Sequence, residues 1–172
     1  GLVAPMHYYG LNDETDLRSV KWSRTSRAYD VEALSDFYVR LGDSRVKLIL
    51  NELQKRVFDL DGLKALGFCV SIQHAQYMAD RFSYFGVPAA AVTSRTVPFE
   101  RDAAIQRLRA GELKVLFTVD LFNEGVDIPD LNTLLLLRPT ESPIIFLQQL
   151  GRGLRKVPGK VCTVLDFIGE QR

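Results

Sequence analysis

From Leu66 onward, short apolar segments alternate with amphipathic segments whose apolar residues recur at helical spacing. The apolar segments are continuous, so each is expected to be a strand that is buried on both faces. Strands of this kind that are joined by helices form a parallel sheet covered on both sides. The predicted strands are 67–72, 87–92, 114–119, 132–138 and 160–166. The predicted helices are 73–85, 98–110 and 143–150 or beyond. The pattern predicts a doubly wound α/β domain over residues 60–172.

Residues 1–59 precede this pattern and are predicted to form an N-terminal extension or linker with an edge strand and helices. The segment HYYGL at 7–11 is the candidate edge strand. Apolar spacing predicts two helices, 31–41 with Asp30 as its N-cap and 44–58. Basic and aromatic residues alternate before them, at Lys21, Trp22, Arg24, Arg27 and Tyr29. This composition fits either a nucleic-acid clamp or packing against a neighbouring domain, and we favour the packing.

The composition limits the classes of function. With 47% apolar and 25% charged residues, the 172-residue chain is expected to fold as a soluble domain with a sizeable core. Its formal net charge is only +1, so a nucleic-acid contact would need a local basic surface. Cys69 and Cys162 lie in apolar segments, as expected of free buried thiols in a reducing compartment. No apolar segment approaches the about 18 residues that span a bilayer, so we expect a cytoplasmic protein with no membrane partner.

The stretch QQLGRGLR at 148–155 contains two arginines at helical spacing, Arg152 and Arg155, with Gln148 four residues before the first. Guanidinium groups make bidentate contacts with phosphate, so this stretch is either a polyanion site or solvated surface. The Ser-Pro pair at 142–143 predicts the start of its helix. The two glycines of this stretch, Gly151 and Gly153, each cost about 1 kcal/mol relative to alanine in a helix interior. They are explained if the backbone passes close to a ligand or a partner domain.

Ligands of open parallel sheets bind beyond the carboxyl ends of the strands. The segment EGVDIP at 124–129 follows one strand, and Gly125 and Asp127 are candidate ligand contacts there. The alternative is a turn closed by Asp127 and Pro129. A P-loop, an acidic pair for Mg²⁺, a Cys/His metal spacing and a serine nucleophile elbow are all missing from the sequence. We therefore expect no metal site within the chain.

Two further strand-end segments carry polar residues. Thr93, Ser94 and Arg95 supply hydroxyls and a cation after strand 87–92, which suits contact with a phosphate backbone. His74 follows strand 67–72 and is a weaker candidate for a phosphate contact, because a lone histidine is more often structural.

Three of these segments together resemble a known family. QxxGRxxR at 148–155, EGVDIP at 124–129 and FCVSIQHA at 68–75 have the order and spacing of motifs VI, V and IV of superfamily 2 DEAD/DEAH-box helicases. Over about residues 60–168 the chain resembles the C-terminal, second RecA-like domain of these proteins, a P-loop NTPase-type fold. The phrases around the motifs are most similar to bacterial helicases of the restriction-enzyme type III subunit class, in multidomain proteins with a phospholipase-D-like nuclease domain.

The resemblance implies roles for residues of this chain. Arg152 and Arg155 match the motif VI arginines that reach the ATP γ-phosphate, Arg155 as the arginine finger, and Gln148 opens that motif. Gly125 and Asp127 match motif V positions near the nucleotide.

The same resemblance implies a nucleic-acid side. It includes Ser71, His74 and the loop with Thr93, Ser94 and Arg95. One departure concerns motif V, where many relatives have Thr directly before Asp and this chain has Val119 before Asp120. The threonine lies one residue earlier, at Thr118, so its hydroxyl is expected on the opposite face of the strand.

The function implied is the second motor domain of an ATP-dependent helicase or translocase acting on DNA or RNA, with DNA favoured. ATP with Mg²⁺ would be held mainly by the first RecA-like domain of the same parent chain, and the present chain alone is expected to be inactive. The chain begins at Gly1 without a methionine, which fits a piece of a longer protein. The alternative is a non-catalytic RecA-like module that binds nucleic acid or regulates a partner.

Overall fold

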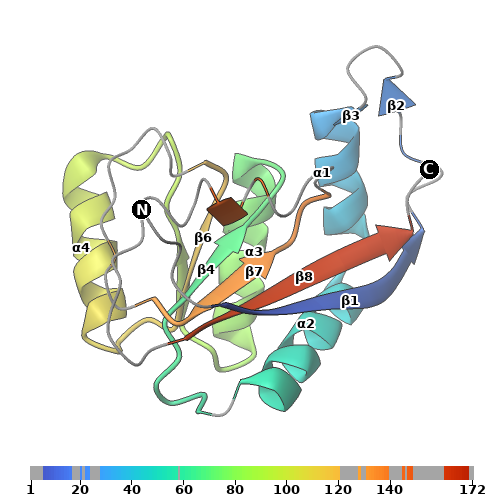
Figure 1. Ribbon diagram of the computed structural model, residues 1–172. Helices are drawn as coiled ribbons and strands as arrows, with labels where there is room; N and C mark the ends of the chain where they lie inside the picture. Colours follow the sequence, from blue (N-terminus) through green and yellow to red (C-terminus); the bar gives the residue numbers. More distant parts are fainter. Residues whose placement is uncertain are drawn as a thin grey trace.

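A computed structural model of the protein describes residues 6–16, 20, 22–23, 28–57, 59–120, 128, 131–139, 145, 147–148 and 161–170. Its main element is a six-stranded sheet with the strand order β1-β8-β7-β4-β6-β5 (Figure 1). Every pair of neighbouring strands in it is parallel. The strands of this sheet are β1 Met6–Asp16, β4 Ala65–Phe68, β5 Ala89–Ala91, β6 Val115–Thr118, β7 Thr133–Leu136 and β8 Cys162–Glu170. The predicted α/β parallel architecture is confirmed.

The helices are α1 Val31–Arg40, α2 Asp43–Arg56, α3 Ile72–Tyr84 and α4 Pro98–Arg109. A separate antiparallel pair consists of β2 Trp22–Ser23 and β3 Ala28–Tyr29. The residues described between Ile145 and Gln148 are helical, as predicted for this segment.

Helices cover both faces of the sheet, and the strand residues alternate between the two resulting cores. One core packs apolar residues of α2 and α3, such as Ile49 and Phe82, against Phe117 and Leu135. The other packs Leu108 of α4 and the side chain of Leu147 against the opposite face. Residues from both sides of position 60 contribute to the first core. The division of the chain at residues 59 and 60 stays a prediction.

The predicted edge strand at 7–11 is confirmed as part of β1, which lies at one edge of the sheet. It pairs in parallel with β8, from Met6 opposite Cys162 to Asn12 opposite Ile168. Figure 1 shows the two strands side by side along their length. This pairing explains why β8 runs beyond the predicted end at residue 166.

The predicted capping of α1 is also confirmed, since the backbone N–H of Ala33 donates to Asp30 Oδ1 at 2.8 Å. The strand predicted at 67–72 is shorter in the structure and ends at Phe68. Ser71 caps α3, and this helix begins at Ile72. The capping hydroxyl therefore ends the extended segment earlier than its apolar composition indicated.

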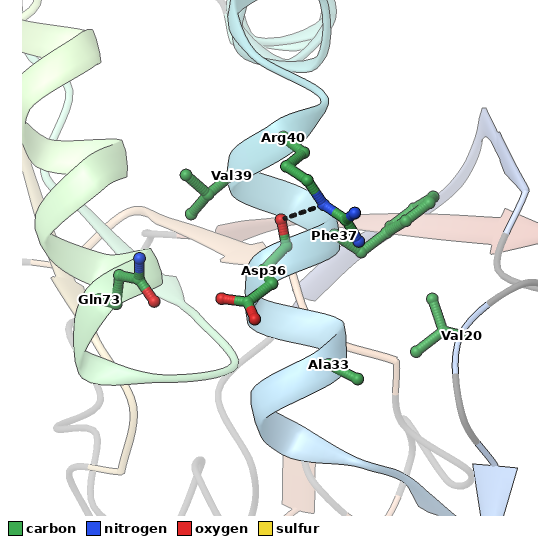
Figure 2. Close-up of a pocket in the computed structure, with 7 residues that line it drawn as sticks. All are labelled: Val20, Ala33, Asp36, Phe37, Val39, Arg40 and Gln73. Atoms are coloured by element: carbon green, nitrogen blue, oxygen red, sulfur yellow. Dashed lines mark hydrogen bonds between the residues drawn. The ribbon is translucent and has the colours of Figure 1, made fainter.

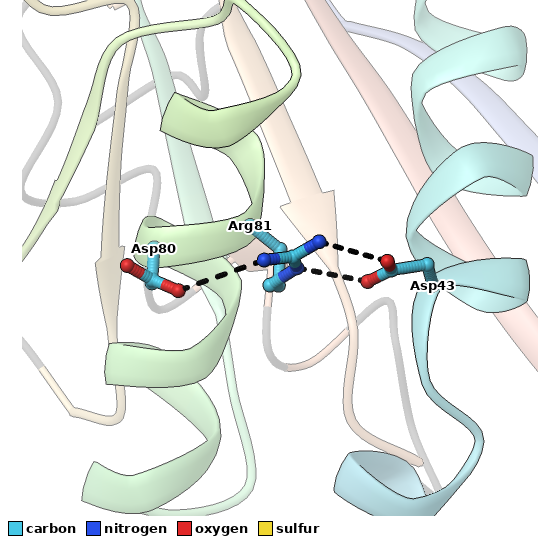
Figure 3. A network of polar contacts seen from close by, with 3 residues as sticks. All are labelled: Asp43, Asp80 and Arg81. Atoms are coloured by element: carbon cyan, nitrogen blue, oxygen red, sulfur yellow. Dashed lines mark hydrogen bonds and ion pairs between the residues drawn. The ribbon is translucent and has the colours of Figure 1, made fainter.

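An ion pair joins the start of α2 to the end of α3 (Figure 3). Arg81 donates to both carboxylate oxygens of Asp43, at 2.9 Å from Nε and 2.8 Å from Nη2. Asp80 lies 4.0 Å from the same guanidinium. Arg81 is the largest cause that holds the pKa of Asp43 below its usual value. This bidentate contact fixes the two helices that cover one face of the sheet.

Candidate nucleic-acid and nucleotide site

The ends of three strands, β4, β6 and β7, lie in register at the carboxyl edge of the sheet, and β8 continues past them. Phe68 of β4 is opposite Thr118 of β6 on one side and Leu136 of β7 on the other. Leu136 is in turn opposite Asp166 of β8. The segments that follow β4, β5, β6 and β7 therefore leave the sheet at one edge, as the prediction of a ligand site required.

Ser71, the first predicted nucleic-acid contact, caps the start of α3 at this edge. Its hydroxyl accepts the backbone N–H of His74 at 3.0 Å and also pairs with the hydroxyl of Ser35 in α1. The side chain is half-buried. Its capping role is thus established in the structure, while a contact with nucleic acid stays a prediction.

His74 lies inside the protein, with only 1% of its surface exposed. The backbone N–H of Val70 donates to its Nδ1 at 3.1 Å. Burial, with a smaller effect of Arg45, lowers the pKa of His74 to about 3, so the imidazole is neutral. A phosphate contact is not available to this side chain in the structure. The prediction of a phosphate contact at His74 is therefore wrong, because α1 packs over α3 and covers the ring.

His74 belongs to a stack of three side chains that the sequence reasoning missed. The imidazole stacks on Tyr38 of α1, and the guanidinium carbon of Arg45 lies 4.1 Å from the centroid of the tyrosine ring. Arg45 Nη2 also donates to the carbonyl of Leu137, directly after β7, at 3.4 Å. The one local signal was a basic residue beside the apolar positions of α2. The stack connects the ends of β4 and β7 to the N-terminal helices.

Arg138 makes a similar connection at the next strand ends. Its Nη1 donates to the carbonyl of Val119 at 3.3 Å, which joins the segment after β7 to the segment after β6.

The loop after β5 contains Thr93, Ser94 and Arg95, and it divides them into buried and exposed residues. Thr93 is 4% exposed, and its Oγ1 accepts the backbone N–H of Arg95 at 3.2 Å. Thr96 Oγ1 accepts the N–H of Thr93 at 2.9 Å. Ser94 and Arg95 are exposed. The hydroxyl of Thr93 therefore shapes the loop, and the two exposed residues are the ones placed to meet a ligand.

The residues predicted to meet the nucleotide lie mostly outside the described part of the chain. Gly125, Asp127, Arg152 and Arg155 all fall there, so their roles stay predictions. Gln148 is described, and it is an exposed residue in the same short helical stretch as the buried Leu147. The start of the QxxGRxxR segment is thus packed against the sheet through Leu147 while Gln148 faces outward.

Thr118 ends β6 and is 1% exposed, and its Oγ1 has no hydrogen-bond partner among the described residues. A hydroxyl that is buried in this way cannot reach a nucleic-acid backbone. This placement agrees with the expectation drawn from its displaced position in motif V.

Asp166 lies in the same register row as Thr118, Phe68 and Leu136, and the sequence reasoning missed it. It is 4% exposed, and the hydroxyl of Tyr8 in β1 donates to its Oδ2. Burial raises the pKa of Asp166, and the bond from Tyr8 acts in the opposite direction. The signal in the sequence was an acidic residue inside the apolar run VCTVLDFI. The pair ties the edge strand β1 to β8.

A surface cavity of about 550 Å³ lies beside α1 and the start of α3 (Figure 2). Its lining consists of Val20, Ala33, Asp36, Phe37, Val39, Arg40 and Gln73. One carboxylate and one guanidinium face this space, so their charges offset each other. The cavity therefore provides no clear attraction for a phosphate.

Within the described residues, no group of three or more His, Cys, Asp or Glu side chains is placed to hold a metal ion. The helices in this part of the chain are also too short or too polar to cross a membrane.

The fold is shared with two solved structures. A fragment assigned to the HsdR subunit of a type I restriction enzyme from Vibrio vulnificus YJ016 aligns with a TM-score of 0.62 and 24% identity, over 97% of this chain and 32% of that one. The E. coli DEAD-box protein SrmB, in its complex with RraA, aligns with a TM-score of 0.58 and 18% identity, over 98% of this chain and 79% of that one. The sheet and its helices thus have the RecA-like α/β fold of these two proteins.

Sequence comparisons identify the family. Residues 45–157 match the family model for the helicase conserved C-terminal domain. A 51.5 kDa protein of a Lactococcus phage (isolate 7-9) is 32% identical over 96% of this chain and 35% of its own length. IRC3 of Saccharomyces cerevisiae, assigned as an ATP-dependent helicase, is 35% identical over 91% of this chain and 22% of its own length. The chain belongs to the helicase conserved C-terminal domain family, and it spans about a third or less of these two relatives.

Proposed function

We propose that this chain is the second motor domain of an ATP-dependent nucleic-acid helicase or translocase. The observation that carries the proposal is the match of residues 45–157 to the helicase C-terminal domain family. The strand ends that meet at one edge of the sheet support it, because the predicted nucleotide and nucleic-acid residues follow those strands.

In this proposal the nucleotide binds between this domain and a first RecA-like domain of the same parent chain. Arg155 is the arginine finger, and Arg152 assists it at the γ-phosphate. Gln148, Gly125 and Asp127 contact the nucleotide from this side. A guanidinium suits the role because it stays charged and donates in a fork that matches phosphate oxygens. Mg²⁺, held mainly by the first domain, would neutralise phosphate charge.

The nucleic-acid strand is proposed to run along the carboxyl edge, where Ser94 and Arg95 are exposed and Ser71 is half-buried. DNA is favoured over RNA. The finer relationship, to restriction-enzyme type III subunit-class helicases with a phospholipase-D-like nuclease domain, is likewise a proposal, as is a cytoplasmic location.

The test uses the full-length parent protein with Arg155→Ala. The variant is expected to lose about 10³-fold or more of its nucleic-acid-stimulated ATPase rate, because an arginine finger is worth that much in P-loop enzymes. Arg107→Ala is the matched control, since Arg107 is an exposed arginine in the last turn of α4. This variant is expected to keep normal ATP turnover. Near-normal turnover in Arg155→Ala would remove the finger assignment.

A second candidate is a non-catalytic RecA-like module, for which the exposed cation of Arg95 offers a contact with nucleic acid. Under this alternative the parent protein binds nucleic acid without ATP turnover, and Arg152→Ala or Arg155→Ala lowers only that binding. The 172-residue chain by itself is expected to show no ATPase activity under either proposal. Robust turnover by the purified chain would contradict a nucleotide site that is shared with another domain.

A further inference from the structure

Phe99 is the most exposed large apolar side chain in the described part of the molecule, at 83% exposure. It occupies the first turn of α4, and the neighbouring Val97 is 53% exposed. Farther along the same helix, Leu108 is fully buried against the sheet. The helix is therefore anchored, and the exposed ring at its start is held away from the core instead of contributing to it.

The loop before α4 holds its shape through its own hydrogen bonds. Besides the two hydroxyl bonds of Thr93 and Thr96, the N–H of Thr96 donates to the carbonyl of Thr93 at 3.0 Å. Ser94 and Arg95 project from this turn into solvent. A fixed turn thus presents a hydroxyl, a cation and an aromatic ring within six consecutive residues.

This group lies at the carboxyl edge of the sheet. The loop leaves β5, which pairs with β6 through Ala91 opposite Phe117, one residue before the row of strand ends. Figure 1 shows α4 beginning at the end of the sheet toward which β4 points. The exposed ring is therefore on the side of the domain where the proposed function places the nucleic-acid strand.

We propose that Phe99 stacks on an unpaired base of this strand while Ser94 and Arg95 contact the adjacent phosphates. The inference rests on the proposed function and names a base-contacting residue for it. Aromatic rings stack on bases of any sequence, and arginine and serine are common partners of backbone phosphates. A motor that moves along a strand needs contacts of this sequence-tolerant kind.

The surroundings of Phe99 favour a base over a protein partner. A stable protein interface buries about 800 Å² on each side, far more than one ring and one valine provide. The next residues of the helix are the exposed Glu100 and Asp102 and the half-buried Arg101, which lies 3.8 Å from Asp102. The two carboxylates repel phosphates along the helix, so the proposed backbone contact is confined to Ser94 and Arg95.

The experiment measures binding of the full-length parent protein to a single-stranded dT oligonucleotide and to an abasic strand of the same length. Phe99→Ala is expected to weaken binding of the dT strand by about 5- to 150-fold, the range for loss of one base–aromatic stack. It is expected to leave binding of the abasic strand nearly unchanged. Phe99→Trp keeps an aromatic ring, so this variant should bind the dT strand nearly as tightly as the unmodified protein. Arg95→Ala should weaken both strands alike, because it acts on phosphates.

Tyr84→Ala is the matched control, since Tyr84 is 71% exposed but belongs to the last turn of α3, at the opposite end of the sheet. Its dT affinity should equal that of the unmodified protein. Unchanged dT affinity in Phe99→Ala, or equal losses on both strands, overturns the inference. A parent protein without nucleic-acid-stimulated ATPase activity contradicts the proposed motor function instead, and the unmodified protein reveals that result.

Discussion

The imidazole of His74 stacks on the ring of Tyr38, with ring centroids 5.1 Å apart and ring planes inclined by 15°. The stack joins the first turn of α3 to α1, while Nδ1 accepts the N–H of Val70 at the end of the preceding loop. A histidine that accepts this bond and packs against an aromatic ring in the interior must stay neutral to keep both contacts. The packing of α1 on α3 therefore depends on the protonation state of one residue.

We predict that folding stability decreases as the pH falls below about 6.5. The folded-state pKa of His74, about 3, lies below its unfolded value of 6.5, so the unfolded chain takes up the proton first. The resulting loss is on the order of 1 kcal/mol between about pH 7.5 and about pH 5.5. Urea unfolding at the two pH values measures it.

The control for this effect is the other histidine of the chain, His7, which is exposed in β1. His74→Asn should be less stable but should lack this part of the pH dependence, whereas His7→Asn should keep it. The same pH dependence in both variants would show that another group is responsible.

Gly67 and Phe117 define a second stability test, in the centre of the sheet. A Cβ at position 67 would lie 2.5 Å from Cδ1 of Phe117, whose ring is fully buried against Phe82. Gly67→Ala is expected to destabilise the fold by about 1–3 kcal/mol through this overlap. In Gly62→Ala the new Cβ would lie 2.8 Å from Oδ2 of the exposed Asp59 side chain, which can move away, so its effect should be small.

A double-mutant cycle identifies the cause. If the ring is the obstacle, Gly67→Ala should cost less in a Phe117→Leu background than in the unmodified protein, as measured by chemical unfolding. Equal costs in the two backgrounds would exclude the overlap with Phe117.

A third prediction concerns the cap of α1. Asp30→Ala removes the acceptor of the Ala33 N–H and should cost about 0.5–2 kcal/mol of stability. Asp30→Ser should recover most of this loss, because a hydroxyl can also cap. Asp36→Ala, an exposed position within the same helix, controls for the loss of negative charge. The stabilities are compared by thermal or urea unfolding. If Asp30→Ser were as unstable as Asp30→Ala, the capping role would be contradicted.

The sequence allowed the sheet and most of the helices to be predicted, because apolar periodicity and capping are local properties. The cap at Asp30 and the edge strand at 7–11 are examples. Contacts between distant segments were not accessible in the same way. The burial of His74 depends on Tyr38, and the bond between Tyr8 and Asp166 joins the two ends of the chain.

The candidate site shows the same division. The strand-end positions of Ser71 and Thr93 followed from the predicted order of strands and loops. Their hydrogen bonds did not, because a serine or threonine that caps a helix or closes a turn has the same sequence signature as one that faces a ligand.

The pairing of Tyr8 with Asp166 gives the last prediction, which concerns the edge strand. Tyr8→Phe removes the donor to a carboxylate that is 4% exposed, and an unsatisfied buried acceptor costs about 1–3 kcal/mol near neutral pH. Burial already raises the folded-state pKa of Asp166, so its charged form costs stability above that pKa, and this cost declines as the pH falls from the folded pKa toward the unfolded value of 3.8. Loss of the Tyr8 bond should raise this pKa further. The deficit of Tyr8→Phe should therefore shrink in acid, which urea unfolding at about pH 7 and about pH 4 tests. Tyr9→Phe, on the neighbouring residue that packs against the opposite core, should show no such dependence on pH. A deficit of Tyr8→Phe that is equal at both pH values would mean that Asp166 is not the group that its hydroxyl stabilises.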